Sequence, residues 1–172
     1  MFLALGLVLP FFTGQIKEIG NMLLPMHLPV MLCGLVCSHR HGLALGAALP
    51  IVRSLTFGMP MLFPSAVAMA LECATYGFVI GFLFERSKHK RVTTLYVCMI
   101  IAMIAGRAVW GASMLALLGM KGELFTFSAF FAGAFANAVP GIILQFVIIP
   151  PIILVLGKAR LLQYTEDKEK KI

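Results

Sequence analysis

Residues 42–85 read GLALGAALPIVRSLTFGMPMLFPSAVAMALECATYGFVIGFLFE, and they contain two apolar runs with a turn between them. The first run covers about residues 42–57 and the second about residues 65–84. The intervening GMPMLFPS has the glycine and the prolines that are typical of a turn. A helix needs roughly 20 mainly apolar residues to cross a membrane. We therefore predict that this stretch forms two membrane helices.

The rest of the chain has the same character. Of its 172 residues, 60% are hydrophobic and 12% are charged, and the mean hydropathy is +0.98. Soluble domains carry roughly 25% charged residues, so a globule this apolar would not cover its own surface in water. Lipid must take the place of water as the solvent. We predict an all-α integral membrane protein with a single membrane domain over residues 1–172, in which residues 157–172 form a polar cytoplasmic tail.

Four further apolar runs flank the central pair. The two that precede it are short and are separated by the mixed segment TGQIKEIGNMLLPMH, and the two that follow it are long enough to span. With the central pair they predict a bundle of six transmembrane helices. The four flanking runs cover about residues 2–12, 28–37, 92–118 and 138–156.

The lysines and arginines between these runs are unevenly divided. One predicted side of the membrane holds only Lys17 and Lys121, and the other lysines and arginines between the runs lie on the opposite side. The more basic side is cytoplasmic under the positive-inside rule. Both termini are then cytoplasmic, as expected of a multi-pass protein of the bacterial cell membrane. The net charge of +7 is explained by these clusters and does not indicate nucleic-acid binding. The basic side carries Arg40, Arg86, Lys88, Lys90, Arg91, Lys158, Arg160, Lys168, Lys170 and Lys171.

The cysteines do not predict a disulfide framework or a metal site. All four (Cys33, Cys37, Cys73, Cys98) lie in apolar stretches, where cysteine is usually a small buried hydrophobe. The sequence CGLVCSHRH brings two of them near His39 and His41, but the C-x3-C spacing matches no standard zinc pattern. Phosphate-loop, nucleophile-elbow and zinc-protease motifs are also absent from the sequence. We expect no metal, no cofactor and no enzymatic activity.

Three charged residues lie within the predicted spans: Arg53, Glu72 and Arg107. Each costs roughly 2.5–3.5 kcal/mol at the centre of a bilayer on insertion scales, which makes intramembrane charges candidates for function. Asn137 and Gln145 add two uncharged polar groups. The predicted topology places all five in the outer half, on four different spans. That convergence predicts a binding site rather than a proton relay, which would need ionisable groups in the inner half as well.

The charges and their neighbours suggest what the site binds. Two arginines against one glutamate leave a positive charge that suits a ligand carboxylate or phosphate. The alternative is a buried structural ion pair between Glu72 and either arginine. Four more side chains are candidates for the same site, although each is also typical of an interface belt or a packed interior. They are Tyr76, Trp110, His27 and Met26.

Small residues recur at a spacing that allows helices to pack closely. Gly42 and Gly46 lie four residues apart in one central span, and Gly77 and Gly81 in the other. Small-x3-small faces let two backbones approach each other in lipid. We predict close helix contacts at these positions.

Three segments of the sequence resemble those of a known family. GNMLLPMHLPVMLCGLVC near the start, the central stretch 42–85 and AGRAVWG resemble the substrate-binding S components of energy-coupling factor (ECF) vitamin transporters over almost the whole length. The resemblance implies six helices, cytoplasmic termini and a vitamin pocket in the outer half. It also implies a transmembrane coupling subunit and two ATPase subunits as partners, which use ATP. Small residues of the first helix, here Ala4 and Gly6, are expected to dock on the coupling subunit.

The vitamin is left open by the sequence. The excess of arginine favours an anionic compound such as pantothenate or niacin, and pyridoxine or hydroxymethylpyrimidine are neutral alternatives. Two other functional classes compete with a transporter subunit. One is a structural membrane scaffold without a small-molecule ligand. The other is an intramembrane enzyme using Glu72 and His27, which lacks an accompanying nucleophile or metal cluster.

Overall fold

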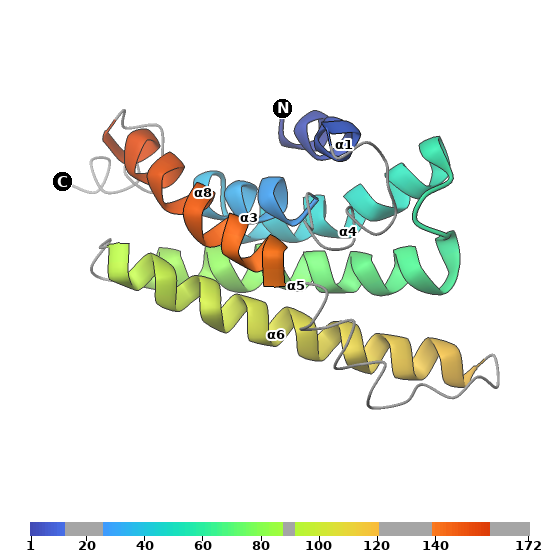
Figure 1. Ribbon diagram of the computed structural model, residues 1–172. Coiled ribbons are helices and arrows are strands. Elements are labelled where there is room, and N and C mark those ends of the chain that lie inside the picture. The colour runs from blue at the N-terminus through green and yellow to red at the C-terminus, as the bar shows by residue number, and fades with distance from the viewer. Residues whose placement is uncertain (13–25, 88–91, 121–138, 159–172) are drawn as a thin grey trace.

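The computed structural model describes residues 1–12, 26–87, 92–120 and 139–158, and this part of the chain is helical without strands (Figure 1). The mixed segment at 13–25, the loop that begins at Lys121 and the tail beyond residue 158 lie outside the described residues. The helices are α1 (Phe2–Phe12), α3 (His27–Val36), α4 (His39–Phe57), α5 (Val67–Arg86), α6 (Val92–Gly119) and α8 (Val139–Lys158), and a π-helical turn, η1 (Leu62–Ala66), precedes α5.

Helix α5 lies at the centre of the bundle. It contacts α3 and α4 on one side and α6 on the other, while α8 contacts both α3 and α6 (Figure 1). Helix α1 packs on α3 and α4, on the side of this layer away from α5. Figure 1 also shows that α4, α5 and α6 alternate in direction along the chain. Helices α3, α4 and α6 therefore pack on α5, and α1 and α8 pack on these neighbours.

The predicted apolar runs all form helices, with boundaries close to those expected. The largest difference is at α4, which begins three residues early because the SHRH segment is its first turn. The predicted turn between α4 and α5 is confirmed. Gly58 ends α4 with a φ of 69°, a left-handed conformation that glycine adopts without strain.

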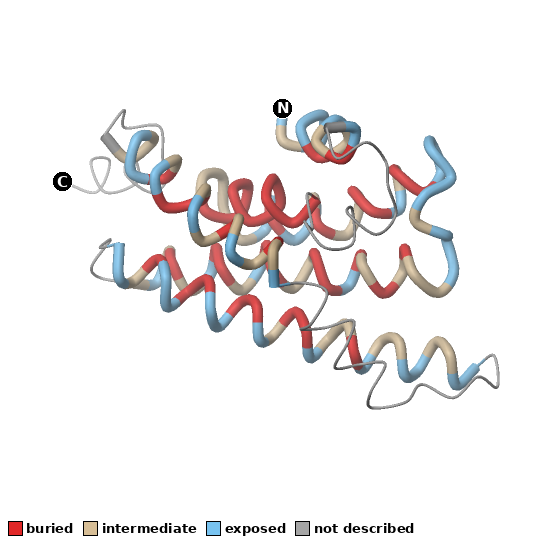
Figure 2. The backbone as a smooth tube through the Cα atoms, viewed as in Figure 1, coloured by how far each residue is buried: buried red, intermediate tan, exposed pale blue. Residues whose placement is uncertain are grey.

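Three described helices are long and apolar enough to cross a membrane, namely Leu62–Arg86, Val92–Gly119 and Val139–Gly157. Helices α1 and α3 are apolar but shorter. Many large apolar residues are exposed, among them Leu55, Ile104 and Val147. Figure 2 shows exposed positions along the outer sides of the helices. Such a surface is unfavourable in water and is suited to contact with lipid. The structure therefore supports the prediction of a helical membrane protein.

The apolar interior has two parts. The larger packs α3, α5, α6 and α8 together through fully buried side chains such as Met31, Ile80 and Met99. The smaller joins α3, α4 and α5 through Met26, Val30, Leu49 and Cys73. Figure 2 shows this burial on the facing sides of the helices.

Glycines bring α3, α4 and α5 into backbone contact. A Cβ atom on Gly77 of α5 would collide with the backbone of Gly42 on α4, and one on Gly34 of α3 would collide with the carbonyl oxygen of Gly77. Gly46 is equally close to the backbone of Cys73, and Gly81 to that of Gly34. We call the close approach of the helices at Gly34, Gly42, Gly46, Gly77 and Gly81 the glycine contact. It confirms the close packing predicted from the glycine spacing.

Candidate functional site

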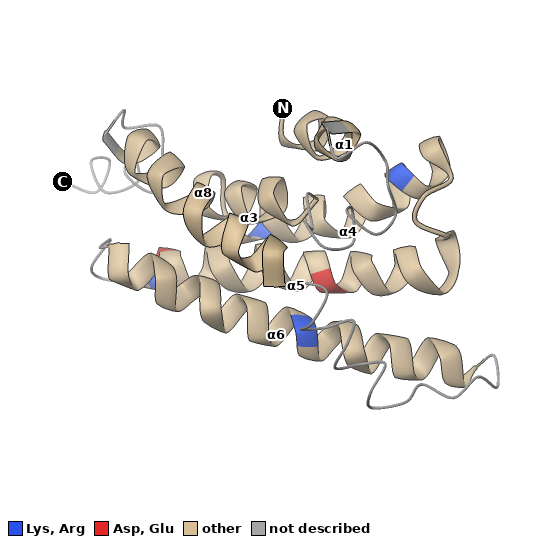
Figure 3. Cartoon of the chain, viewed as in Figure 1, with Lys and Arg blue, Asp and Glu red and all other residues tan. Residues whose placement is uncertain are grey.

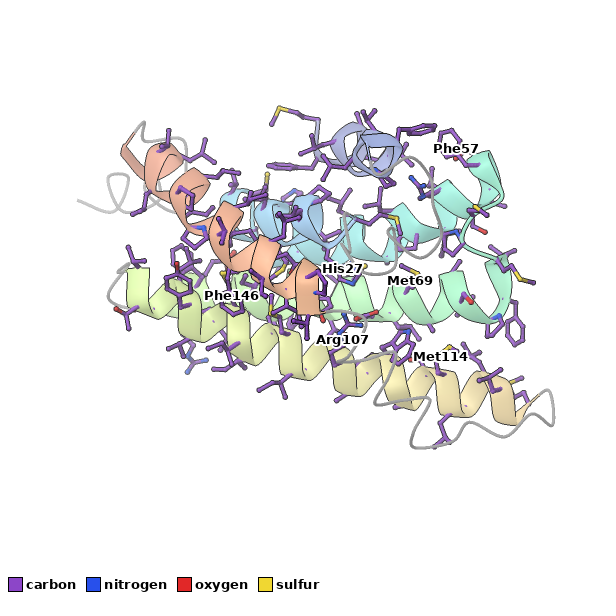
Figure 4. All side chains as sticks on the ribbon, in the orientation of Figure 1. His27, Phe57, Met69, Arg107, Met114 and Phe146 are labelled. Carbon is purple, nitrogen blue, oxygen red and sulfur yellow. The ribbon has the colours of Figure 1, made fainter. Side chains whose placement is uncertain are left out.

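A cluster of buried polar side chains lies where α3, α5 and α6 meet. Glu72 of α5 is 2% exposed, Arg107 of α6 is 5% exposed and His27 of α3 is 1% exposed. Nη1 of Arg107 is 3.0 Å from Oε1 of Glu72, and Nε2 of His27 is 3.5 Å from the same oxygen. Figure 3 shows how few charged residues the described helices carry besides these, and Figure 4 shows His27 and Arg107 in the same region. We call His27, Glu72, Tyr76 and Arg107 the Glu72 cluster.

Tyr76 completes this cluster, one helical turn after Glu72 on α5. Its ring meets the ring of His27 edge-on, with centroids 5.0 Å apart. Its hydroxyl donates to the carbonyl oxygen of Met103 on α6 at 3.5 Å. The ring lies directly over Gly106, where a Cβ atom would be 2.9 Å from two of its carbons. Gly106, which no sequence pattern marks as a site residue, thus makes room for Tyr76 beside Arg107.

Several polar atoms of the cluster lack a hydrogen-bond partner among the described residues. They are both ring nitrogens of His27, Oε1 of Glu72, and Nε and Nη2 of Arg107. Oε1 of Glu72 still lies within ion-pair distance of two nitrogens. Buried polar groups are nearly always hydrogen-bonded, because an unmet donor or acceptor is unfavourable away from water. The cluster therefore has the capacity to bind further polar atoms.

The structure separates Arg53 from this cluster. Nη1 of Arg53 donates to the carbonyl oxygen of Leu7 on α1 at 3.3 Å. Its guanidinium carbon is 6.0 Å from the ring centre of Phe11 and 5.8 Å from that of Phe57. Figure 4 shows Phe57 at the end of α4, well away from His27 and Arg107. Arg53 thus fastens α1 to α4, and the predicted convergence of both arginines on Glu72 is wrong for Arg53.

The structure gives the burial or the packing of three other predicted site residues. Gln145 on α8 is buried at 2% exposure, and Trp110 on α6 is half-buried. Met26 belongs to the smaller apolar interior with Val30 and Leu49, as expected of a packing residue. Asn137 lies outside the described residues.

A second polar contact joins the start of α4 to the end of α5. The backbone N–H of His39 donates to Oε1 of Glu85 at 2.9 Å, and Nδ1 of His39 is 2.6 Å from Oε2. Both side chains are partly exposed, at 24% and 31%. The carboxylate occupies the N-terminus of α4, where free N–H groups favour an anion. The only sequence signal for this contact was a carboxylate at the end of one run and a histidine at the start of another.

No metal-binding constellation is found within the ranges that the structure describes, where no three His, Cys, Asp or Glu side chains are grouped to hold an ion. All four cysteines are thiols rather than members of a disulfide. Three of them, Cys33, Cys73 and Cys98, are buried in the packed interior.

The model of one protein family, described as the ECF transporter, substrate-specific component, matches residues 1–153. The chain belongs to this family. No curated protein and no solved structure matches it. The family comprises transporter components and is not an enzyme class. As a substrate-specific component of a transporter, the chain is expected to present a binding site, and the Glu72 cluster is the candidate for it among the described residues.

The two positions expected to dock this S component on its coupling subunit differ in exposure. Ala4 lies on the surface of α1. Gly6 is buried, and a Cβ atom at this position would collide with the side chain of Leu49 on α4, 2.5 Å away. Gly6 therefore serves contact within the chain, and only Ala4 is on the surface where a partner could reach it.

Proposed function

We propose that this chain is the substrate-binding S component of an ECF importer that captures a small water-soluble vitamin or vitamin precursor from outside the cell. It delivers the compound inward together with a transmembrane coupling subunit and two ATPase subunits, which supply ATP hydrolysis. In this proposal the chain crosses the bacterial cell membrane six times, with both termini in the cytoplasm. The family assignment supports the transport role, and the uneven placement of lysine and arginine supports the topology.

The observation that carries the proposal is the set of unpartnered polar atoms in the Glu72 cluster. A purely structural ion pair is favourable only when additional hydrogen bonds meet the remaining donors and acceptors. Nη1 of Arg107 forms an ion pair with Glu72, but Nε and Nη2 have no hydrogen-bond partner within the described ranges. A bound polar ligand would meet these donors. Tyr76 and the apolar residues around it would then form the walls of the site.

The structure changes the argument for an anionic ligand. The sequence predicted that two arginines and one glutamate share the site, which leaves one excess positive charge. Arg53 lies elsewhere, so the site contains one arginine, Arg107, and one glutamate, Glu72. The free donors of Arg107 still favour a ligand with strong acceptors, above all a carboxylate. We therefore keep pantothenate and niacin as the leading candidates, and pyridoxine and hydroxymethylpyrimidine as neutral ones.

Mass spectrometry of compounds that co-purify with the protein tests this function. The full chain, purified in mild detergent from cells grown in rich medium, should carry a stoichiometric small molecule. Arg107→Gln should lose it, because that change removes the free donors. Arg40→Gln, which changes an exposed arginine at the start of α4, should retain it. Absence of any compound from both the wild-type chain and Arg40→Gln, together with no saturable uptake in cells expressing the ECF partners, would contradict the proposal.

A further inference from the structure

One particular edge of Arg107 has no hydrogen-bond partner among the described residues. A guanidinium group is planar, and its Nε and Nη2 donors lie side by side along one edge. These are the two nitrogens without a partner among the described residues, whereas Nη1 is 3.0 Å from Glu72. Two parallel N–H donors match the two oxygens of a carboxylate. The geometry therefore offers a bidentate anion site that is already held in place from the other side by Glu72.

The charges of the cluster do not yet balance with an anion bound there. Glu72 and Arg107 together are neutral, and both are almost completely buried. A ligand carboxylate on Arg107 would leave one uncompensated negative charge in a region of low dielectric. An isolated buried charge is strongly unfavourable, and proteins avoid it by pairing the charge or by changing a protonation state.

His27 is placed to supply the missing positive charge. It is 1% exposed, its Nε2 is 3.5 Å from Oε1 of Glu72, and neither ring nitrogen has a hydrogen-bond partner in the described part of the chain. Histidine is the side chain that gains or loses a proton near physiological pH. A neutral imidazole already carries one N–H, so its other ring nitrogen can accept one proton beside the carboxylate when an anion arrives.

The helices packed around His27 offer few competing titratable groups. Helix α5 contributes Glu72, Cys73 and Tyr76, and α6 contributes Arg107. On α4, Arg53 is hydrogen-bonded to α1 instead, and the other titratable side chains, His39, Arg40 and His41, lie in its first turn. Residues 2–12 of α1 and residues 139–157 of α8 contain no titratable side chain.

We propose that a small carboxylate binds the Nε–Nη2 edge of Arg107 together with one proton on His27. This inference rests on the proposed function, and it specifies the chemistry of the ligand and its linkage to pH. Because the complex holds one proton more than the free protein, affinity is highest at low pH and falls as pH rises. The fall approaches tenfold per pH unit above the range in which His27 of the free protein titrates.

Isothermal titration calorimetry on the detergent-solubilised full chain measures this proton directly. The probes are nicotinate and pantothenate, each compared with an uncharged analogue, nicotinamide or pantothenol. Titrations in phosphate and in Tris, whose ionisation enthalpies differ, give the number of protons taken up per ligand. We expect uptake of about one proton per carboxylate, and binding of the uncharged analogue at least about tenfold weaker than that of its partner.

Two histidine variants locate the proton. His27→Gln should abolish proton uptake and leave a weaker, pH-independent affinity. His39→Gln, at the partly exposed contact with Glu85, should retain uptake of one proton. The wild-type measurement needs no variant, so it stands even if His27→Gln does not fold.

Three results would overturn the inference: no proton uptake by the wild-type chain, uptake that persists in His27→Gln, or failure of both carboxylates to bind more tightly than their uncharged analogues. A different compound carried through purification would in each case still support the proposed function. The two proposals therefore fail separately.

Discussion

At the scale of single residues, Glu72 is the acidic side chain whose environment matters most. It is almost fully buried, and its carboxylate faces Arg107 and His27 from two neighbouring helices. Ions in the interior of a protein have lost their hydration, so each depends on the other for its stability. Removal of one member leaves the other without compensation.

Replacement of Glu72 by glutamine should therefore destabilise the fold. The change keeps the shape but leaves Arg107 charged and buried, and breaking such a pair costs about 3 kcal/mol or more. Thermal unfolding of the purified protein, followed by a thiol-reactive dye on the buried cysteines, would measure the loss.

A matched control for this change is Glu85→Gln. Glu85 is about one-third exposed and contacts a partly exposed histidine, so we expect a loss of about 1 kcal/mol or less. If the two variants unfolded at the same temperature, the buried pair of Glu72 and Arg107 would contribute no more to stability than the partly exposed contact of Glu85.

The sequence grouped polar residues into one site without specifying which of them are partners. Charge placement indicated that Glu72 and Arg107 lie at similar levels, and they do meet. It grouped Arg53 with them incorrectly, because position along a helix does not give the direction in which a side chain points. The contact of His39 with Glu85 spans 46 residues and depends on how α4 and α5 align, which hydropathy does not reveal.

At the scale of helices, α1 is attached through a small number of specific contacts. Arg53 donates to the backbone of α1 and lies near Phe11, whose ring meets that of Phe57 edge-on at 5.0 Å. Leu49 fills the space beside Gly6. Helix α4 therefore helps, together with α3, to hold α1 on the bundle.

Arg53→Gln should loosen α1 without weakening ligand binding. Loss of the cation–π contacts and of the bond to Leu7 removes about 1–2 kcal/mol locally. Amide hydrogen exchange in residues 2–12 should become about tenfold faster, since exchange reports local opening. Arg40→Gln, at the exposed opposite end of α4, is the control. A drop in affinity with unchanged exchange would instead assign Arg53 to the binding site.

The glycine contact makes α3, α4 and α5 sensitive to a single added methyl group. Gly77→Ala would press a Cβ atom into the backbone of Gly42, which has no flexible side chain to move aside. We expect a loss of about 1–3 kcal/mol or failure to assemble, measured as thermal stability and as the yield of monodisperse protein.

Gly119→Ala provides the comparison for this change. Gly119 ends α6 and has no atom within 4 Å of the added Cβ, so stability should be unchanged or slightly raised. Equal effects at the two positions would show that helix propensity rather than backbone contact decides the outcome.

Helix boundaries were largely predictable because apolar runs and glycine or proline turns mark them. The exception, the early start of α4, follows from Glu85 and Ser38, which accept hydrogen bonds from the first N–H groups of the helix. The sequence contained both residues but not the information that α5 would carry Glu85 to that point.

At the scale of the whole molecule, the uneven distribution of lysine and arginine predicts cytoplasmic termini. Fluorescent protein fused to the C-terminus should therefore be bright, since it matures in the cytoplasm, and alkaline phosphatase at the same position should be inactive. The reverse pattern would invert the topology and place the Glu72 cluster in the inner half of the membrane.

The unequal lengths of the helices have a consequence for the surrounding bilayer. Helix α6 has 28 residues, and at 1.5 Å per residue it is about 42 Å long, well beyond a hydrocarbon core of about 30 Å. Helix α3 has 10 residues and reaches only about 15 Å. Lipid next to α6 can thicken, the helix can tilt, or its ends can extend beyond the hydrocarbon core, and the first two responses have an energetic cost that grows with mismatch.

Membrane thickness should therefore influence this protein. Reconstituted in phosphatidylcholines of increasing acyl length, it should reach its highest thermal stability in bilayers thicker than average, with α6 less tilted there. Polarised infrared dichroism of the oriented bilayers would follow the tilt. A stability that is independent of acyl length would mean that α6 projects freely into water rather than matching the lipid around it.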